Sequence, residues 1–187
     1  MGVNTLTLVH HFLSEWIEPG SFVIDATAGN GRDTVFLCEQ TGRDGQVLAF
    51  DIQPQAVENT RRRLAAEGWD GVGRVVLDSH ANMARYAQAG AVDYIVFNLG
   101  WLPGGDHRIF TRPDSTIAAI EAGLGLLREG GRMCVSIYYG GASGCEERDA
   151  LLDYFKTIDP TRFTVLVTQF ANRAGDPPIP VFITKST

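Results

Sequence analysis

The chain has 187 residues, of which 44% are apolar and 20% charged, an ordinary globular composition that can enclose one substantial core but hardly two. Its net charge of −6 argues against broad non-specific nucleic-acid binding, because that affinity comes largely from neutralised phosphates. No apolar run approaches the roughly 20 residues of a membrane helix and no secretory signal pattern opens the chain, so we expect one soluble, cytoplasmic domain over residues 1–187.

The first half of the chain alternates helical and strand-like segments. Apolar residues at helical spacing predict a helix over residues 5–17, packed on the rest of the domain. A short apolar run predicts a strand over residues 22–25, and a helix follows over residues 33–40. The next strand is expected over residues 46–51, and Pro54 suits the first turn of a helix that extends to about residue 69.

The second half continues the alternation. Strands are predicted over residues 74–78, 93–98 and 132–139, and the helix between the last two begins near Ser115 and ends at Gly130-Gly131. After a helix over residues 146–158, two β-rich stretches, 162–170 and 181–184, predict a closing antiparallel hairpin. The sequence therefore predicts an α/β fold with a mostly parallel seven-stranded sheet, helices on both faces and right-handed crossovers.

Residues 22–34 join a buried-strand pattern to a glycine turn and a helix start, the construction of a nucleotide-cofactor site. Gly29 and Gly31 permit a tight turn and a close approach of the backbone to a ligand. Thr34 stands where the dinucleotide pattern G-x-G-x-x-G wants its third small residue, so the match to an NAD fingerprint is partial. The acid Asp25 before the glycines resembles the first motif of S-adenosylmethionine (SAM) methyltransferases, where it typically helps to position the methionine part of the cofactor.

Acidic residues end the second and third predicted strands, at the edge where open α/β sheets bind ligands. Asp51 follows Gly31 by 20 residues, the separation at which an acid reaches the ribose hydroxyls. Asp78 can accept a hydrogen bond from the amine of adenine. An NAD site does not need an acid at the end of the third strand. The alternative for each carboxylate is a helix cap or a turn, and the nearby His80 is more typical of a surface histidine.

Residues 98–107 follow the fourth strand and are rich in glycine, and a loop of this kind in a compact domain is usually functional. Asn98 offers an amide and a carbonyl, and Asp106 and His107 can accept protons. The alternative is a glycine-rich turn with a capping Asp. Tyr138 and Tyr139 end the fifth strand and either form an aromatic wall for a flipped base or simply finish the strand.

Metal and hydrolase chemistry have little support. The three cysteines show no C-x-x-C spacing, the adjacent His10 and His11 diverge on a helix, and no H-x-x-x-H spacing occurs. A serine hydrolase is disfavoured because the G-x-S-x-G elbow is missing. We therefore predict no metal.

Taken together, these motifs resemble a family of small SAM-dependent enzymes labelled "putative rRNA methylases", and the resemblance spans nearly the whole chain. It rests on residues 25–34, 98–107 and 138–141 together with Asp51, the run Asp78-Ser79-His80 and Thr116. The resemblance implies a Rossmann-like class I SAM methyltransferase. It also implies N-methylation of the primary amine of 5-aminomethyl-uridine, often 2-thiolated, at the tRNA wobble position, with the anticodon stem-loop as partner. Where other amine methyltransferases carry Asn or Asp, Pro, Pro and an aromatic residue, this chain has Asn98-Leu99-Gly100-Trp101.

Three sets of site residues follow from the motifs and the resemblance. The predicted catalytic residues are Asn98, Asp106 and His107, and the sequence does not distinguish which of the last two handles the proton. The predicted cofactor residues are Asp25, Thr27, Gly29, Asn30, Gly31, Asp33, Thr34, Asp51, Gln53, Asp78, Ser79, His80 and Asn98. The predicted substrate residues are Trp101, Arg108, Arg112, Tyr138 and Tyr139. Formation of a homodimer would be one way to enlarge the RNA surface.

Three other functions stay open on sequence alone. The same cofactor residues would serve a SAM methyltransferase that acts on rRNA, a small molecule or a protein amine. The acidic net charge favours the small molecule or the protein. An NAD-dependent oxidoreductase is disfavoured by Asp25, Thr34 and Asp78. A non-catalytic SAM-binding module would leave the polar residues of segment 98–107 without a purpose.

Overall fold

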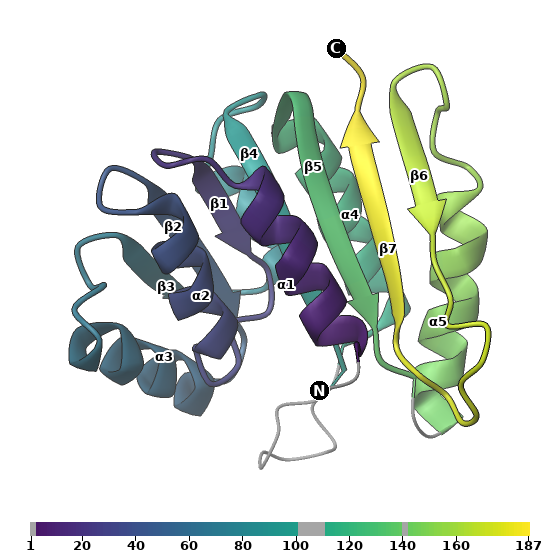
Figure 1. Ribbon diagram of the computed structural model, residues 1–187, viewed down its shortest axis with the longest axis horizontal. Coiled ribbons are helices and arrows are strands. Elements are labelled where there is room, and N and C mark those ends of the chain that lie inside the picture. Colours follow the sequence, from purple (N-terminus) through teal and green to yellow (C-terminus); the bar gives the residue numbers. More distant parts are fainter. Residues whose placement is uncertain (1–2, 101–110, 140–141) are drawn as a thin grey trace.

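A single mixed sheet organises the molecule in the computed structural model, which describes residues 3–100, 111–139 and 142–187 (Figure 1). Within these residues the sheet has seven strands in the order β3-β2-β1-β4-β5-β7-β6. The strands are β1 (Phe22–Asp25), β2 (Gln46–Asp51), β3 (Gly73–Leu77), β4 (Val92–Leu99), β5 (Leu127–Ile137), β6 (Phe163–Val167) and β7 (Ile179–Lys185). The first five pair in parallel, whereas β7 runs antiparallel to both β5 and β6. The predicted fold class and closing hairpin are confirmed.

Helices cover both faces of the sheet, as Figure 1 shows. One face carries α1 (Thr5–Trp16), α2 (Arg32–Thr41) and α3 (Pro54–Ala66). The other carries α4 (Pro113–Leu126), α5 (Ala142–Phe155) and the 3₁₀ helix η1 (His80–Arg85). Alternate residues of a strand point to opposite faces, and in β2 this places Val47 in the core below α1 and α2, and Leu48 and Phe50 in the core below α4 and α5. Both faces of the parallel strands are therefore buried.

Two predicted helix ends are corrected by the structure. The helix expected to end at Gly130-Gly131 ends at Leu126, because Leu127 already pairs with Val92 in the sheet and β5 starts there. The helix α3 ends at Ala66 rather than near residue 69, because Gly68 turns the chain at φ +72°. The helix η1 was not predicted from the sequence, since its six residues are too few to show a period.

The helix α1 reaches the edge of the sheet at which β1 to β5 end (Figure 1). Its Val9 and Leu13 are buried in the core. At its N-terminal end Thr5 Oγ1 donates a hydrogen bond of 2.7 Å to the carbonyl of Pro178, in the loop before β7. The helix is thus fixed at both the sheet and the loop, and its first turns stand beside the carboxyl ends of the strands.

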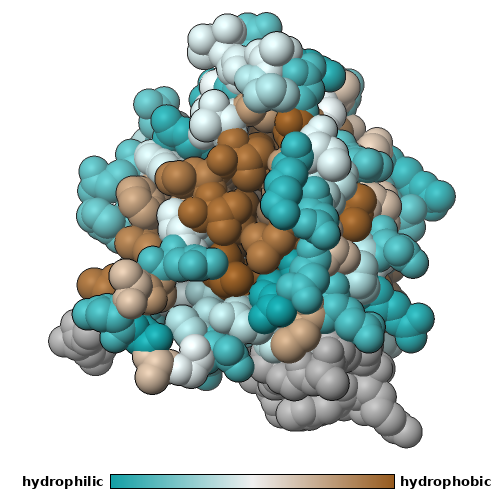
Figure 2. All heavy atoms as spheres, turned by 90° about the vertical axis from the view of Figure 1, so that its right-hand side faces the viewer, coloured by the Kyte–Doolittle hydropathy of each residue, from teal (hydrophilic) through white to brown (hydrophobic). Residues whose placement is uncertain are grey.

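The strand β6 forms one edge of the sheet and leaves the large apolar side chains of Leu166 and Val167 exposed. Figure 2 views the molecule from this side and shows apolar surface gathered there. No helix within the described residues is long and apolar enough to cross a membrane.

Candidate active site

A cavity of about 870 Å³ opens at the carboxyl ends of the parallel strands. This is the place where open α/β sheets bind their ligands, and the volume lies within the range of small-molecule and cofactor sites. Its wall combines the turn after β1, the ends of β2, β3, β4 and β5, the first turns of α1 and the loop before β7. The side chains predicted to end the second to fifth strands therefore meet around one space.

The glycine turn after β1 lies between α3 and the cavity, and each of its two glycines serves one side. Gly29 and Gly31 have φ of +53° and +76°, which favour glycine. A Cβ on Gly31 would lie only 2.9 Å from Cα of Thr60 in α3, and the Thr60 hydroxyl donates to the carbonyl of Gly29. Gly31 is therefore required for close packing against α3, whereas Gly29 lines the cavity.

Asp25 lies beneath this turn, fully buried. Its carboxylate accepts hydrogen bonds from the Thr34 hydroxyl at 2.6 Å and from the backbone N–H of Thr27 at 3.1 Å. Burial raises the pKa of Asp25 to about 7, since desolvation outweighs these two hydrogen bonds. The carboxylate supports the turn from below and does not line the cavity.

Asp51 at the end of β2 lines the cavity and caps the glycine turn. One carboxylate oxygen accepts from the backbone N–H of Gly29 and the other from that of Gln53, both at 2.9 Å. Burial nevertheless raises the pKa of Asp51 above its usual value. The carboxylate is held in one orientation, and its remaining lone pairs can accept hydrogen bonds from hydroxyl groups.

Asp78 is engaged by its own segment. It accepts hydrogen bonds from the Ser79 N–H, the Asn82 side-chain amide and the Tyr86 hydroxyl at 2.7–2.8 Å. The hydrogen bonds from Asn82 and Tyr86 lower the pKa of Asp78. An ionised acceptor is thus fixed at the cavity wall beside the end of β3.

His80, the first residue of η1, faces the cavity in a neutral form. Burial lowers its pKa, and its Nδ1 lies 3.1 Å from the carbonyl of Ala26. Because a carbonyl only accepts, Nδ1 carries the proton and Nε2 is left as an acceptor. His80 therefore ties η1 to the turn after β1.

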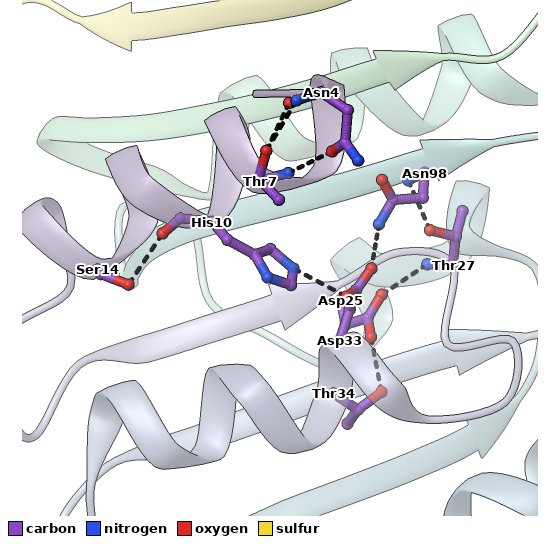
Figure 3. Close-up of polar contacts among 9 residues, drawn as sticks. All are labelled: Asn4, Thr7, His10, Ser14, Asp25, Thr27, Asp33, Thr34 and Asn98. Carbon is purple, nitrogen blue, oxygen red and sulfur yellow. Dashed lines mark hydrogen bonds and ion pairs between the residues drawn. The ribbon is translucent and has the colours of Figure 1, made fainter. Parts of the chain in front are cut away.

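A chain of hydrogen bonds crosses one wall of the cavity, from α1 through α2 to β4 (Figure 3). Nε2 of His10 lies 2.9 Å from Oδ1 of Asp33, whose Oδ2 accepts from Nδ2 of Asn98 at 2.6 Å. The backbone N–H of Asn98 donates to the Thr27 hydroxyl at 2.7 Å. His10 also stacks on Phe36, with 3.9 Å between the ring centroids and 6° between the planes. These hydrogen bonds thus connect Asn98 to α2 and, through Asp33, to α1.

Glu147 of α5 ties together the residues at the rim of the cavity. It is only 3% exposed and accepts from the hydroxyls of Thr111 at 2.6 Å and Thr116 at 2.7 Å. Thr111 Oγ1 in turn accepts from the backbone N–H of Gly100. Gly100 and Thr111, the residues that flank segment 101–110, therefore lie together at the rim.

Most of the predicted site residues meet at this cavity. Those that line it are Thr27, Gly29, Asn30, Asp33, Asp51, Gln53, Asp78, Ser79, His80, Asn98, Tyr138 and Tyr139. Burial raises the pKa of the Tyr138 hydroxyl. Asp25, Gly31 and Thr34 lie outside the lining, and Arg112 is an exposed residue that precedes α4. The predicted residues Trp101, Asp106, His107 and Arg108 lie outside the described part of the chain.

Sequence reasoning missed the side of the cavity that α1 and the loop before β7 provide. Leu6 and His10 come from α1, and Asp176 and Pro178 from the loop. Leu6 and His10 are four residues apart and so share a helix face, but nothing in the local sequence shows that this face turns toward a ligand. The packing of α1 on the sheet decides that this face lines the cavity.

A parallel sheet with a glycine turn after β1, an acid at the end of β2 and an inserted antiparallel β7 defines a Rossmann-like nucleotide-cofactor enzyme of the SAM methyltransferase type. Comparison with known proteins specifies the family. The model of the family described as "Putative rRNA methylase" matches residues 47–184, and the chain belongs to this family.

Two solved structures share the fold over almost their full length. One is from Clostridium thermocellum, described as a putative rRNA-methylase, with 41% identity, a TM-score of 0.95 and 99% of each chain covered. The other, from Streptococcus mutans, is described as a putative methyltransferase in complex with SAH, with 37% identity, a TM-score of 0.86 and 99% of each chain covered. The cofactor of this class of enzymes is SAM.

A curated relative from Arabidopsis thaliana is named tRNA (mnm(5)s(2)U34)-methyltransferase, chloroplastic. It is 34% identical over 182 residues, which cover 92% of this chain. The chain spans 66% of the length of that plant protein.

Proposed function

We propose that the protein transfers a methyl group from SAM to the primary amine of 5-aminomethyl-uridine, with or without 2-thiolation, at the tRNA wobble position. The observation that carries the proposal is the side chain of Asn98, held at the cavity wall by Asp33, beside the turn expected to bind the cofactor. The name of the plant relative supports the same substrate.

The residues that line the cavity fit the polar groups of SAM. Asp51, whose carboxylate is held by the N–H groups of Gly29 and Gln53, would accept hydrogen bonds from the ribose hydroxyls. Asp78, held by the N–H of Ser79, would accept one from the adenine amine. Gly29 and Asn30, which line the cavity, would hold the methionine part. When bound, the cofactor supplies an electrophilic methyl group on a sulfonium.

The amine must be neutral to attack, and its nitrogen becomes cationic as the bond to the methyl group forms. Acceptor groups satisfy both demands, because they orient the N–H bonds of the amine and stabilise the cation. Asn98 offers such an acceptor through its side-chain carbonyl. We assign removal of the proton to Asp106 or His107, as the sequence predicts. Alignment of the two reactants can itself contribute roughly 7–11 kcal/mol toward the barrier.

The substrate base would enter past the ends of β5 and α4. Tyr138 and Tyr139 line the cavity, and Tyr138 is exposed enough, at 36%, to stack on a base. A wobble base lies in a single-stranded loop, whose bases proteins commonly splay out and stack on aromatic side chains. As the sequence predicts, we assign stacking on the base to Trp101 and contacts with phosphates of the anticodon stem-loop to Arg108 and Arg112.

The test is a methylation assay with labelled SAM and tRNA that carries 5-aminomethyl-uridine, followed by digestion and mass spectrometry of the nucleosides. We expect 5-methylaminomethyl-uridine from the wild type, and a loss of about a hundredfold or more in kcat for Asn98→Ala. Calorimetry should show that this variant still binds SAM.

SAM binding without any methylated nucleoside would refute the tRNA assignment. The net charge of −6 would then favour a small-molecule or protein amine as substrate. An Asn98→Ala variant with full turnover would refute the role of Asn98 alone.

A further inference from the structure

The hydrogen-bond chain at the cavity wall begins at a residue to which the proposed reaction assigns no role. His10 lies on α1, 88 positions before Asn98 in the sequence, and its side chain is 29% exposed. Its ring stacks on Phe36 and forms a hydrogen bond with the carboxylate of Asp33. Two separate contacts thus fix one imidazole at the edge of the cavity, as Figure 3 shows for the polar one.

The partners in this row of hydrogen bonds determine which atoms of His10 and Asn98 carry hydrogen. An ionised carboxylate only accepts, so the nitrogen of His10 that faces Asp33 carries a proton, and the Asn98 atom that faces Asp33 is the amide nitrogen. The opposite orientation of the Asn98 amide would set its carbonyl oxygen 2.6 Å from a carboxylate oxygen, without a hydrogen between them. The Asn98 carbonyl oxygen therefore points away from Asp33.

In the part of the chain that the structure describes, the Asn98 carbonyl oxygen is left as an acceptor. Within residues 3–100, 111–139 and 142–187, the side-chain hydrogen bond of Asn98 is made by Nδ2 alone. Asn98 lines the cavity next to Thr27, which holds its backbone. A nucleophile that carries N–H bonds would find this oxygen in a defined direction.

We propose that His10 is a positioning residue for methyl transfer: it holds Asp33 against the Asn98 amide, so that the Asn98 carbonyl faces the cavity and orients the amine of the substrate. The inference rests on the proposed function, because it assumes that an amine enters beside Asn98. Without His10, one oxygen of Asp33 loses its partner and the carboxylate can rotate away from Asn98. The amine would then be bound in several orientations, of which few are productive.

Three variants separate this role from a structural one. His10→Phe keeps an aromatic ring to stack on Phe36 but removes the donor to Asp33. His10→Gln restores a neutral N–H donor. His11→Phe is the matched control, since His11 is the exposed neighbour on the same helix.

In the tRNA methylation assay we expect kcat to fall roughly ten- to a hundredfold in His10→Phe, the loss typical of one hydrogen bond to a charged group. The KM for tRNA and the Kd for SAM should change less than about threefold. His10→Gln should recover kcat to within about threefold of the wild type, and His11→Phe should match the wild type. An unchanged kcat in His10→Phe, or a Kd for SAM that weakens as much as kcat falls, would overturn the proposal.

Nitrogen-15 NMR of the wild type without substrate tests the hydrogen bonds between His10, Asp33 and Asn98 independently of turnover. We expect His10 to be protonated at Nε2. The side-chain amide signals of Asn98, identified by their loss in Asn98→Ala, should shift in His10→Phe and not in His11→Phe. Signals that do not move in His10→Phe would overturn the proposal even if the tRNA is methylated. A wild type that methylates no nucleoside, but shows these shifts, would refute only the choice of substrate.

Discussion

Replacement of Asp25 by Asn should make the stability of the protein less dependent on pH. Asp25 is fully buried, and desolvation raises its pKa from 3.8 to about 7. The folded state therefore keeps a proton between about pH 4 and pH 7 that the unfolded state has released. Because the folded state binds more protons in this window, the free energy of unfolding falls as pH rises through it.

The magnitude follows from the two pKa values. Each unit of difference corresponds to 1.36 kcal/mol, so the full penalty is on the order of 4 kcal/mol above pH 8, and about 2–3 kcal/mol of it develops between pH 5 and pH 8. Asn has nearly the same shape and can still accept from the Thr27 N–H. Since it does not ionise, it carries none of this penalty.

The assay is urea unfolding followed by circular dichroism at pH 5, 6, 7 and 8. The free energy of unfolding of Asp25→Asn should rise relative to the wild type by about 2–3 kcal/mol across this range. Asp44→Asn, which changes an exposed carboxylate, is the control and should track the wild type. A constant difference between Asp25→Asn and the wild type at all four pH values would show that Asp25 is ionised in the folded protein, and the reasoning would be wrong.

Three further changes test the architecture of the site. Glu147→Leu leaves two threonine hydroxyls without their buried acceptor and should lower the free energy of unfolding by about 2–4 kcal/mol in urea titrations; a loss below about 1 kcal/mol would contradict this role. Gly31→Ala should cost more stability in the same titrations than Gly20→Ala, since both have positive φ but only the first meets the backbone of α3; equal losses would refute the packing argument. Asp51→Ala should weaken SAM binding about ten- to a hundredfold by calorimetry, with Asp44→Ala unchanged, and an unaltered Kd would remove Asp51 from the cofactor site.

The sequence by itself determined the class of fold and the edge of the sheet that carries the site. Strand and helix periods are local properties, so the alternation of elements could be read directly, and most predicted strands agree with the structure within one or two residues. In a parallel sheet the strand ends must meet on one edge. The convergence of Asp51, Asp78 and Asn98 on one cavity followed from this rule and is confirmed.

Element ends were less predictable where pairing in the sheet competes with local preference. Residues 127–131 continue a helical pattern in the sequence, but Leu127 gains a strand partner in Val92, and α4 ends before it. Such competition depends on a segment that lies about 35 residues away in the chain. It is not visible in a local window of sequence.

The tertiary structure alone decided which polar residues face the cavity. Asp25 and Thr34 belong to the glycine-turn motif, yet they bond to each other beneath the turn, because the strand alternation directs the Asp25 side chain into the core. His10 belongs to no motif, yet it contacts Asp33 because α1 packs across the sheet through Val9 and Leu13. The direction of a side chain depends on how its element is docked, and docking is the sum of many contacts between residues far apart in the chain.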